Sequence, residues 1–197
     1  MVRLSPSQQD RVSAYLDELY RWNARINLTS VPRAAAWERH VEQSLDLLAA
    51  AAPASEAVVV DIGSGAGLPG IVMALMRPDL SVALVEADVR KAAFLDHVAG
   101  LLGLSHVRVH NRRAEALASD PAHAGTYDIL VSRAAMSAVS ACRIAEALLR
   151  PGGMACLLVA DADRTARELA GRLAGMSVAA SAPQVLTAVL LPQPRPA

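Results

Sequence analysis

A glycine-rich stretch at residues 57–70 has the residue types and spacing of a nucleotide-binding loop. The β-branched run Val58–Val60 is followed by Asp61 and then by the glycines Gly63, Gly65, Gly67 and Gly70. An apolar segment long enough for a helix comes next, and the order strand, glycine turn, helix is typical of a nucleotide-binding βα unit. Glycine lets a ligand approach where a Cβ would collide. A structural turn without a ligand is the alternative interpretation.

Asp61 indicates which ligand this loop would hold. A carboxylate beside a pyrophosphate would meet a like charge, and the glycine spacing departs from the dinucleotide fingerprint. The loop also lacks the Lys-Ser/Thr pair of a P-loop. A cationic ligand suits Asp61, and S-adenosylmethionine (SAM) carries an ammonium and a sulfonium. We therefore interpret Gly63 and Gly65 as part of a SAM loop, with another nucleotide as the alternative.

Residues after the next three predicted strands complete this hypothesis. Glu86 ends the second strand, 23 positions after Gly63, where a carboxylate accepts hydrogen bonds from both ribose hydroxyls. Backbone groups of Ala114 and Glu115, after the third strand, are placed to contact an adenine edge. Arg133 follows the fourth strand, the usual place for a residue that faces substrate or methionine. The alternatives are a structural acid, a helix start and a surface arginine, respectively.

The elements that position these residues alternate along the chain, which predicts a mostly parallel α/β sheet. Helices are expected at 5–29 and 33–50 from apolar positions at helical spacing. The later strands are expected at 58–62, 81–85, 106–110, 127–131, 154–159, 176–180 and 185–191, and the later helices at 67–77, 89–102, 113–118, 137–149 and 161–174. We divide the chain into a helical extension (1–55), a sheet domain (56–192) and a frayed tail (193–197).

Composition restricts the class of protein. With 53% hydrophobic and 19% charged residues, the 197-residue chain suits a globular domain with a small extension. No apolar run reaches the roughly 18 residues that span a bilayer, and the first residues lack a signal-peptide core, so a cytoplasmic protein is expected. The 19 basic and 19 acidic residues balance, which leaves only a local patch for binding nucleic acid. Cys142 and Cys156 lack metal-ligand spacing and are expected to be buried, so no metal is predicted.

Two absent motifs restrict the target of a SAM-dependent reaction. No Asn/Asp-Pro-Pro-Tyr follows the fourth predicted strand, and no Pro-Cys nucleophile occurs. The former is linked with methylation of exocyclic amino groups and the latter with methylation of cytosine C5. Guanine N7 needs neither, because it is unprotonated near neutral pH and carries its own lone pair. Transfer to N7 would rely mainly on orientation and charge complementarity.

Several blocks of the sequence form a combination far more specific than a SAM loop alone. They are Trp22-Asn23-Ala24-Arg25-Ile26-Asn27-Leu28-Thr29, Asp61 to Gly70, Lys91 with Phe94-Leu95, Arg113-Ala114-Glu115, and Ser132-Arg133-Ala134. These blocks are spread across most of the chain. The combination resembles the bacterial 16S ribosomal RNA guanine-N7 methyltransferases, also called the glucose-inhibited division protein B family.

The resemblance implies a class I SAM-dependent methyltransferase fold, Rossmann-like, with a mostly parallel seven-stranded sheet and an N-terminal helical extension. It implies methylation of N7 of the guanine at 16S rRNA position 527, as a step of ribosome biogenesis. The partner would be 16S rRNA or the small ribosomal subunit, and we expect a monomer that binds no membrane. SAM contacts carry over to Gly63, Leu68, Ala114, Glu115 and Arg133, with Glu86 at the ribose. Arg133 is also the residue expected to position the reacting groups.

Two positions depart from the family pattern. Gln43 stands before Ser44-Leu45 where an aspartate is usual, and Val159-Ala160 replaces a frequent Lys-Gly after the fifth strand. The missing lysine removes a candidate contact to RNA or to the target base. The alternatives are a SAM-dependent methyltransferase acting on another RNA or a small molecule, and a SAM-binding protein without activity. The arginines expected to contact RNA are Arg21, Arg25, Arg39, Arg112 and Arg133.

Overall fold

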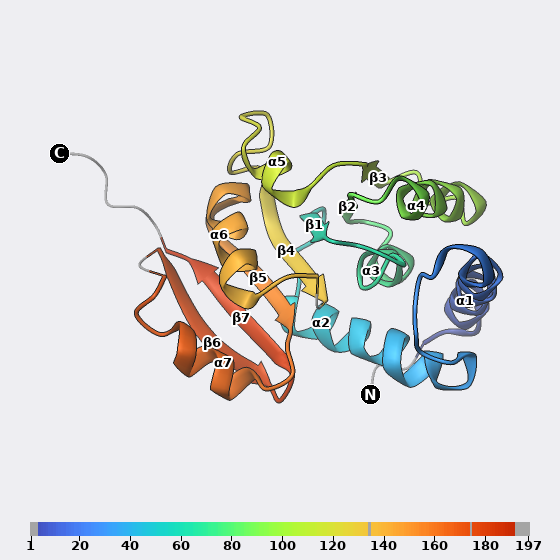
Figure 1. The fold of residues 1–197 in the computed structure, drawn as a ribbon, viewed down its shortest axis with the longest axis horizontal. Coiled ribbons are helices and arrows are strands. Elements are labelled where there is room, and N and C mark those ends of the chain that lie inside the picture. The colour runs from blue at the N-terminus through green and yellow to red at the C-terminus, as the bar shows by residue number, and fades with distance from the viewer. Residues whose placement is uncertain (1–3, 134, 174, 192–197) are drawn as a thin grey trace.

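The computed structural model describes residues 4–133, 135–173 and 175–191. Its strands are β1 (Val58–Ile62), β2 (Ser81–Val85), β3 (Val107–His110), β4 (Tyr127–Arg133), β5 (Leu149–Leu158), β6 (Met176–Ala182) and β7 (Val185–Leu190). They form one sheet in the order β3-β2-β1-β4-β5-β7-β6 (Figure 1). Neighbouring strands from β3 to β5 pair in parallel, whereas β7 pairs antiparallel with β5 and β6. The predicted seven-stranded, mostly parallel sheet is confirmed.

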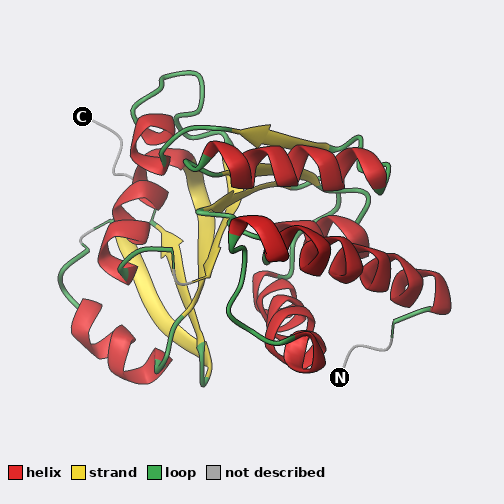
Figure 2. Ribbon diagram, turned by 45° about the vertical axis from the view of Figure 1, so that its right-hand side comes forward, coloured by secondary structure: helices red, strands yellow, loops and turns green. Residues whose placement is uncertain are grey.

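Helices cover both faces of this sheet (Figure 2). They are α3 (Gly70–Met76), α4 (Val89–Leu101), α5 (Ala114–Ala118), α6 (Ala138–Leu148) and α7 (Ala162–Leu169). Val59 of β1 belongs to the hydrophobic cluster that contains Ile71 of α3, whereas Val60 belongs to the cluster that contains Cys142 of α6. A strand buried on both faces is apolar at successive positions, which explains the run that begins β1. Cys142 and Cys156 are both buried, as predicted.

Helices also precede the sheet, and the first is α1 (Pro6–Ile26). Ser5 caps α1 through a reciprocal pair of hydrogen bonds with Gln8, and Pro6 occupies the first turn, as expected for a helix start. The second helix, predicted as one regular helix over 33–50, is wrong in that the segment is not a single α-helix. It consists of a 3₁₀ turn, η1 (Arg33–Ala35), a π-helical segment, η2 (Trp37–Glu42), and α2 (Gln43–Ala51).

The N-terminal helices share a core with the sheet. α1 contacts α3 and α4, while α2 contacts α3, β5 and β7. Val12 and Tyr15 of α1 lie in the same buried cluster as Val59 of β1. The predicted boundary at residue 55 falls in the loop between α2 and β1, and the division into two parts stays a prediction. The predicted tail at 193–197 lies outside the described residues. No helix of the described ranges is long and apolar enough to cross a membrane.

Candidate active site

The glycine loop lies between β1 and α3, at the carboxyl ends of the parallel strands. Gly63 has a φ of 68°, and a Cβ built on it would lie 2.2 Å from the Cβ of Ala135. The chain leaving β4 therefore packs directly against Gly63. Gly65 has a φ of 56°, but the nearest atom to its hypothetical Cβ is the Gly63 carbonyl oxygen at 3.8 Å. Gly63 is thus required by close packing, whereas Gly65 leaves room beside its backbone.

Asp61 is fully buried at the end of β1. Its Oδ2 accepts a hydrogen bond from the Gly70 amide at 3.0 Å, which joins β1 to the first residue of α3. Within the described residues, its Oδ1 is buried without a partner. Burial raises the pKa of Asp61 to about 7, against the opposing effects of the Gly70 amide and the Arg133 cation. An unpartnered buried carboxylate oxygen is satisfied by a hydrogen-bond donor, so the site fits a ligand that carries an ammonium group.

Glu86 bridges the glycine loop and the start of α4. Its Oε2 accepts from the Gly65 amide at 2.9 Å and its Oε1 accepts from the Asp88 amide at 2.8 Å. Asn111, just after β3, donates through Nδ2 to the Glu86 carbonyl at 2.9 Å. A carboxylate has about four acceptor positions, so two are left for hydroxyl groups. The structure therefore places Glu86 beside Gly65, and adds Asn111 as a support to which the sequence had assigned no role.

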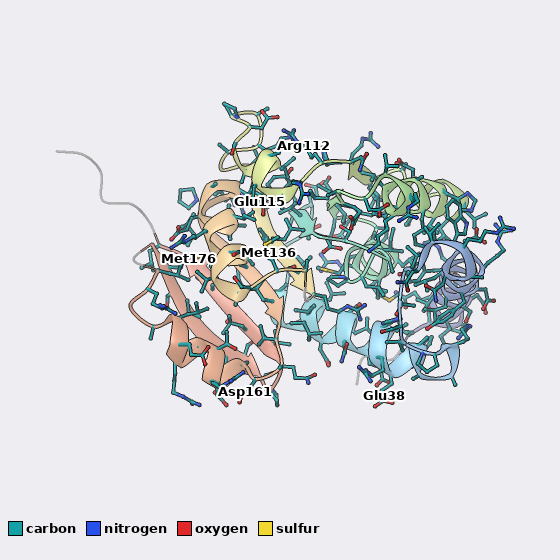
Figure 3. All side chains as sticks on the ribbon, in the orientation of Figure 1. Glu38, Arg112, Glu115, Met136, Asp161 and Met176 are labelled. Carbon is teal, nitrogen blue, oxygen red and sulfur yellow. The ribbon has the colours of Figure 1, made fainter. Side chains whose placement is uncertain are left out.

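The residues predicted near the adenine lie at the start of α5. Ala114 is buried and is the first helical residue, and no side chain caps this helix. Amides in the first helical turn have no partner within their own helix, so Ala114 and Glu115 offer backbone donors. Figure 3 shows the side chain of Glu115 on α5 and Met136 before α6, two helices that contact each other. The side chain of Leu68 is buried in the core, so only its backbone is available to a ligand.

Arg133 ends β4 and reaches the π-helical segment η2. Its Nη1 donates to the Arg39 carbonyl oxygen and to Nδ1 of His40, both at 2.9 Å. The His40 side chain is almost completely buried, and its Nε2 lies 2.9 Å from Oγ1 of Thr29. Burial, followed by the charge of Arg133, lowers the pKa of His40 to about 4. His40 is therefore neutral near pH 7.

Tyr15 is a further contributor from the N-terminal helices. This fully buried residue of α1 donates its hydroxyl to the carbonyl oxygen of Ala66, in the glycine loop, at 2.7 Å. Neither Tyr15 nor His40 was predicted as a site residue. Nothing in the local sequence of either helical segment shows that these side chains meet residues far along the chain.

A cavity of about 600 Å³ opens beside Arg133. The turn after α1, the segment η2 and the chain after β5 line it, through Leu28, Thr29, Ser30, Val31, Arg39, His40, Gln43, Arg133, Leu158, Val159, Ala160 and Gln184. Both departures from the family pattern, Gln43 and Val159-Ala160, therefore lie in one cavity. Among the described residues, no group of three or more His, Cys, Asp or Glu could hold a metal ion.

Comparisons with known proteins identify the same family over most of the chain. The model of the family described as rRNA small subunit methyltransferase G (GidB) matches residues 8–191. The ribosomal RNA small subunit methyltransferase G of Roseiflexus sp. (strain RS-1) is 38% identical over 184 residues, which are 88% of this chain and 76% of the relative. The protein of the same name from Stenotrophomonas maltophilia (strain K279a) is 41% identical over 142 residues, which are 71% of this chain and 63% of the relative.

Solved structures share the fold at low identity. A precorrin-6y C5,15-methyltransferase from Geobacter metallireducens aligns with a TM-score of 0.57 and 15% identity, over 75% of this chain and 87% of that one. A Methanococcus maripaludis protein described as a SAM-dependent methyltransferase aligns with a TM-score of 0.62 and 11% identity, over 99% of both chains. The predicted class I SAM-dependent methyltransferase fold is confirmed. The match over residues 8–191 and the identity to the Roseiflexus protein show that the chain belongs to the rRNA small subunit methyltransferase G family.

Proposed function

We propose that the chain transfers a methyl group from SAM to N7 of the guanine at position 527 of 16S ribosomal RNA. Family membership over residues 8–191 supports the reaction class. The structural observation that carries the proposal is the pair of acids at the ends of β1 and β2. Asp61 has one buried oxygen without a partner among the described residues, and Glu86 is bonded to the Gly65 amide 2.9 Å away. Together these acids suit a ligand with an ammonium at one end and a ribose at the other.

Each predicted contact has a role in this proposal. Asp61 would accept from the ammonium, Glu86 from the ribose hydroxyls, and the Ala114 and Glu115 backbones would contact the adenine. The backbone at Gly63, Gly65 and Leu68 would lie beside the methionine part, and Arg133 would donate to an acceptor of cofactor or substrate. Bound SAM supplies a methyl group on a positively charged sulfur, which a nitrogen lone pair can attack.

The cavity beside Arg133 favours an acceptor atom that needs no deprotonation. His40 is the only imidazole among its lining residues, no carboxylate lines it, and both ring nitrogens of His40 already contact neighbours. An exocyclic amine would require a group that removes a proton at some stage, whereas guanine N7 would not. The residues of the cavity would therefore act by orienting the base rather than by acid–base catalysis.

We further propose a monomer that acts on 16S rRNA or on the small ribosomal subunit. One observation favours a different substrate, because Val159 and Ala160 put apolar side chains in the cavity where the family often has a lysine. The second candidate function is therefore methylation of another RNA or of a small molecule at the same site.

Methyl-labelled SAM tests the proposal with three acceptors: small ribosomal subunits, naked 16S rRNA and a pool of other cellular RNA. We expect label in the subunits or in the 16S rRNA, and none in the pool. Arg133→Ala should greatly reduce the transfer, and Arg108→Ala, on the outer strand β3, serves as the matched control. SAM binding in calorimetry without transfer to either 16S acceptor would reject the proposed substrate.

A further inference from the structure

We infer that His40 is a positioning residue, which sets the direction of the Arg133 guanidinium for the methyl transfer proposed above. The inference rests on that proposed function, and in it His40, which also lines the cavity, acts on the reaction through Arg133. Its basis is a continuous chain of hydrogen bonds through Asn23, Thr29, His40 and Arg133. This chain joins the turn after α1 to the end of β4.

The partners of His40 determine where its proton lies. A guanidinium can only donate, so Nδ1 of His40 must accept from Nη1 of Arg133 through its lone pair. The ring proton of the neutral imidazole is then on Nε2, which donates to Oγ1 of Thr29. That hydroxyl oxygen also accepts from the Val31 amide at 3.1 Å. One tautomer therefore satisfies every contact of this chain.

The Arg39 carbonyl oxygen lies 3.1 Å from the same Nδ1 and does not require the other tautomer. Nη1 of Arg133 carries two hydrogens and lies 2.9 Å from each of these acceptors. One hydrogen can be donated to the carbonyl oxygen and the other to the imidazole. The Arg39 carbonyl and His40 therefore hold the same nitrogen from two directions.

Asn23 holds the far end of the chain in place. Its Oδ1 accepts from the amides of Leu28 at 2.6 Å and of Thr29 at 2.8 Å, and its Nδ2 donates to the Thr29 carbonyl at 3.0 Å. Three bonds from one side chain to the turn fix the position of Thr29. Because Thr29 in turn contacts His40, the N-terminal helices are coupled directly to Arg133.

The held nitrogen leaves the rest of Arg133 available. Within the described residues, the hydrogen bonds of the Arg133 side chain are made by Nη1, so Nε and Nη2 keep their donors. Arg133 also lines the cavity of about 600 Å³. A guanidinium is planar, so fixing Nη1 restricts the plane in which the other donors lie. An acceptor on cofactor or base would then meet donors whose direction is already set.

Two substitutions of His40 separate positioning from packing. His40→Asn keeps an acceptor near the Nδ1 position, whereas His40→Gln keeps a polar group near the Nε2 position and removes the acceptor that faces Arg133. We expect kcat/KM for 16S rRNA to fall about 10- to 100-fold in His40→Gln, the size of loss that a small misplacement causes, and to be largely retained in His40→Asn. Equal losses in two variants with equal melting temperatures, or no loss in either, would overturn the inference.

The tautomer gives a test that does not depend on activity. In full-length protein labelled with ¹⁵N-histidine, which has five histidines, the His40 signal is identified by its loss in His40→Asn. We expect the Nε2–H tautomer in the wild type, and a mixture of tautomers in Arg133→Ala. A wild-type Nδ1–H tautomer, or a tautomer that Arg133→Ala does not change, would contradict the coupling. Failure of the proposed function would instead show as wild-type protein that transfers no label to 16S rRNA, whatever the tautomer.

Discussion

Asp61 is completely buried and its carboxylate accepts one hydrogen bond, from the Gly70 amide. Burial makes its ionised form costly. Burial is the largest of the effects that raise its pKa from 3.8 to about 7, so the protonated acid is favoured only below about pH 7. A raised pKa in the folded state contributes stability below the unfolded pKa, and that contribution is lost as pH rises through the folded pKa. Between about pH 4 and pH 7, ionisation of Asp61 should therefore lower the free energy of unfolding. A cationic ligand beside Asp61 would offset this cost, as the proposed contact with the SAM ammonium requires.

Asp61→Asn should remove this pH dependence. The free energy of unfolding of the SAM-free variant should rise relative to wild type between pH 4 and pH 8, by up to about 4 kcal/mol for a shift of this size. Chemical denaturation at several pH values measures the difference, and calorimetry should show weaker SAM binding by the variant. Parallel stability curves for the two proteins over that range would show that Asp61 is not the group that titrates.

Gly63 can be tested against a glycine of similar backbone conformation. Gly63 and Gly103 have φ values of 68° and 63°, but a Cβ on Gly103 would meet no atom within 4 Å. Alanine at either position carries the left-handed penalty of roughly 1–2 kcal/mol. Gly63→Ala should lose additional stability and SAM affinity, because its methyl group would displace Ala135. Similar losses of stability in both variants, with SAM binding intact, would refute the role of close packing at Gly63.

At the scale of elements, the N-terminal helices form part of the site. Tyr15 of α1 holds the glycine loop through Ala66, and η2 supplies the two groups that hold Arg133. In Figure 1 these helices lie on the same side of the sheet as α3 and α4, opposite α6 and α7. The N-terminal helices therefore hold the glycine loop and supply one wall of the cavity beside Arg133.

Tyr15→Phe tests the contact between helix and loop. Removing the hydroxyl leaves the buried Ala66 carbonyl without this donor, which typically costs about 1–3 kcal/mol. We expect a loss of that size in unfolding by urea, together with weaker SAM binding in calorimetry. Tyr127→Phe is the matched control, because this buried tyrosine contacts Nδ1 of His123 at 2.8 Å, at the amino end of β4. If Tyr15→Phe left SAM affinity unchanged, or if Tyr127→Phe lost as much SAM affinity, the contact between α1 and the glycine loop would have no role in SAM binding.

The sequence predicts best the features that depend on local pattern. The strands at 58–62 and 81–85 were predicted with their observed bounds, because each is an apolar run next to a polar or glycine-rich segment. The helix expected from 67 begins at Gly70, since the loop needs those residues to return to Asp61. The strand expected from 154 begins at Leu149, which pairs with Tyr127 across an irregular register. Pairing between distant segments leaves no local signal.

In the candidate site, too, some residues can be predicted from local sequence and others cannot. Asp61, Gly63 and Glu86 follow from their places at strand ends, and the structure brings the loop and Glu86 together. The roles of Tyr15 and His40 could not be predicted, because each depends on a contact with a residue tens of positions away. The π-helical segment that presents His40 also has no periodic pattern by which it could be distinguished from an ordinary helix.

Over the whole molecule, the 19 basic and 19 acidic residues balance. This net charge does not show how the cations are distributed along the sheet edge where the candidate site lies. Lys91 and Arg113 lie after the carboxyl ends of β2 and β3, and Arg133 ends β4. Within the described part of the chain, no ion pair engages these three cations. Cations after successive strands could contact a phosphate backbone in a protein whose charges balance as a whole. The proposed RNA substrate is therefore compatible with a net charge of zero.

The most direct test of the account locates the methyl group on the RNA. Small subunits with an unmethylated guanine 527 are incubated with the protein and SAM, and the 16S rRNA is then reduced and cleaved with aniline, which breaks the chain at N7-methylated guanine. The account predicts SAM-dependent cleavage at position 527, greatly reduced with Arg133→Ala and retained with Arg108→Ala. Cleavage at another guanine, or methyl transfer to an atom other than N7, would contradict it.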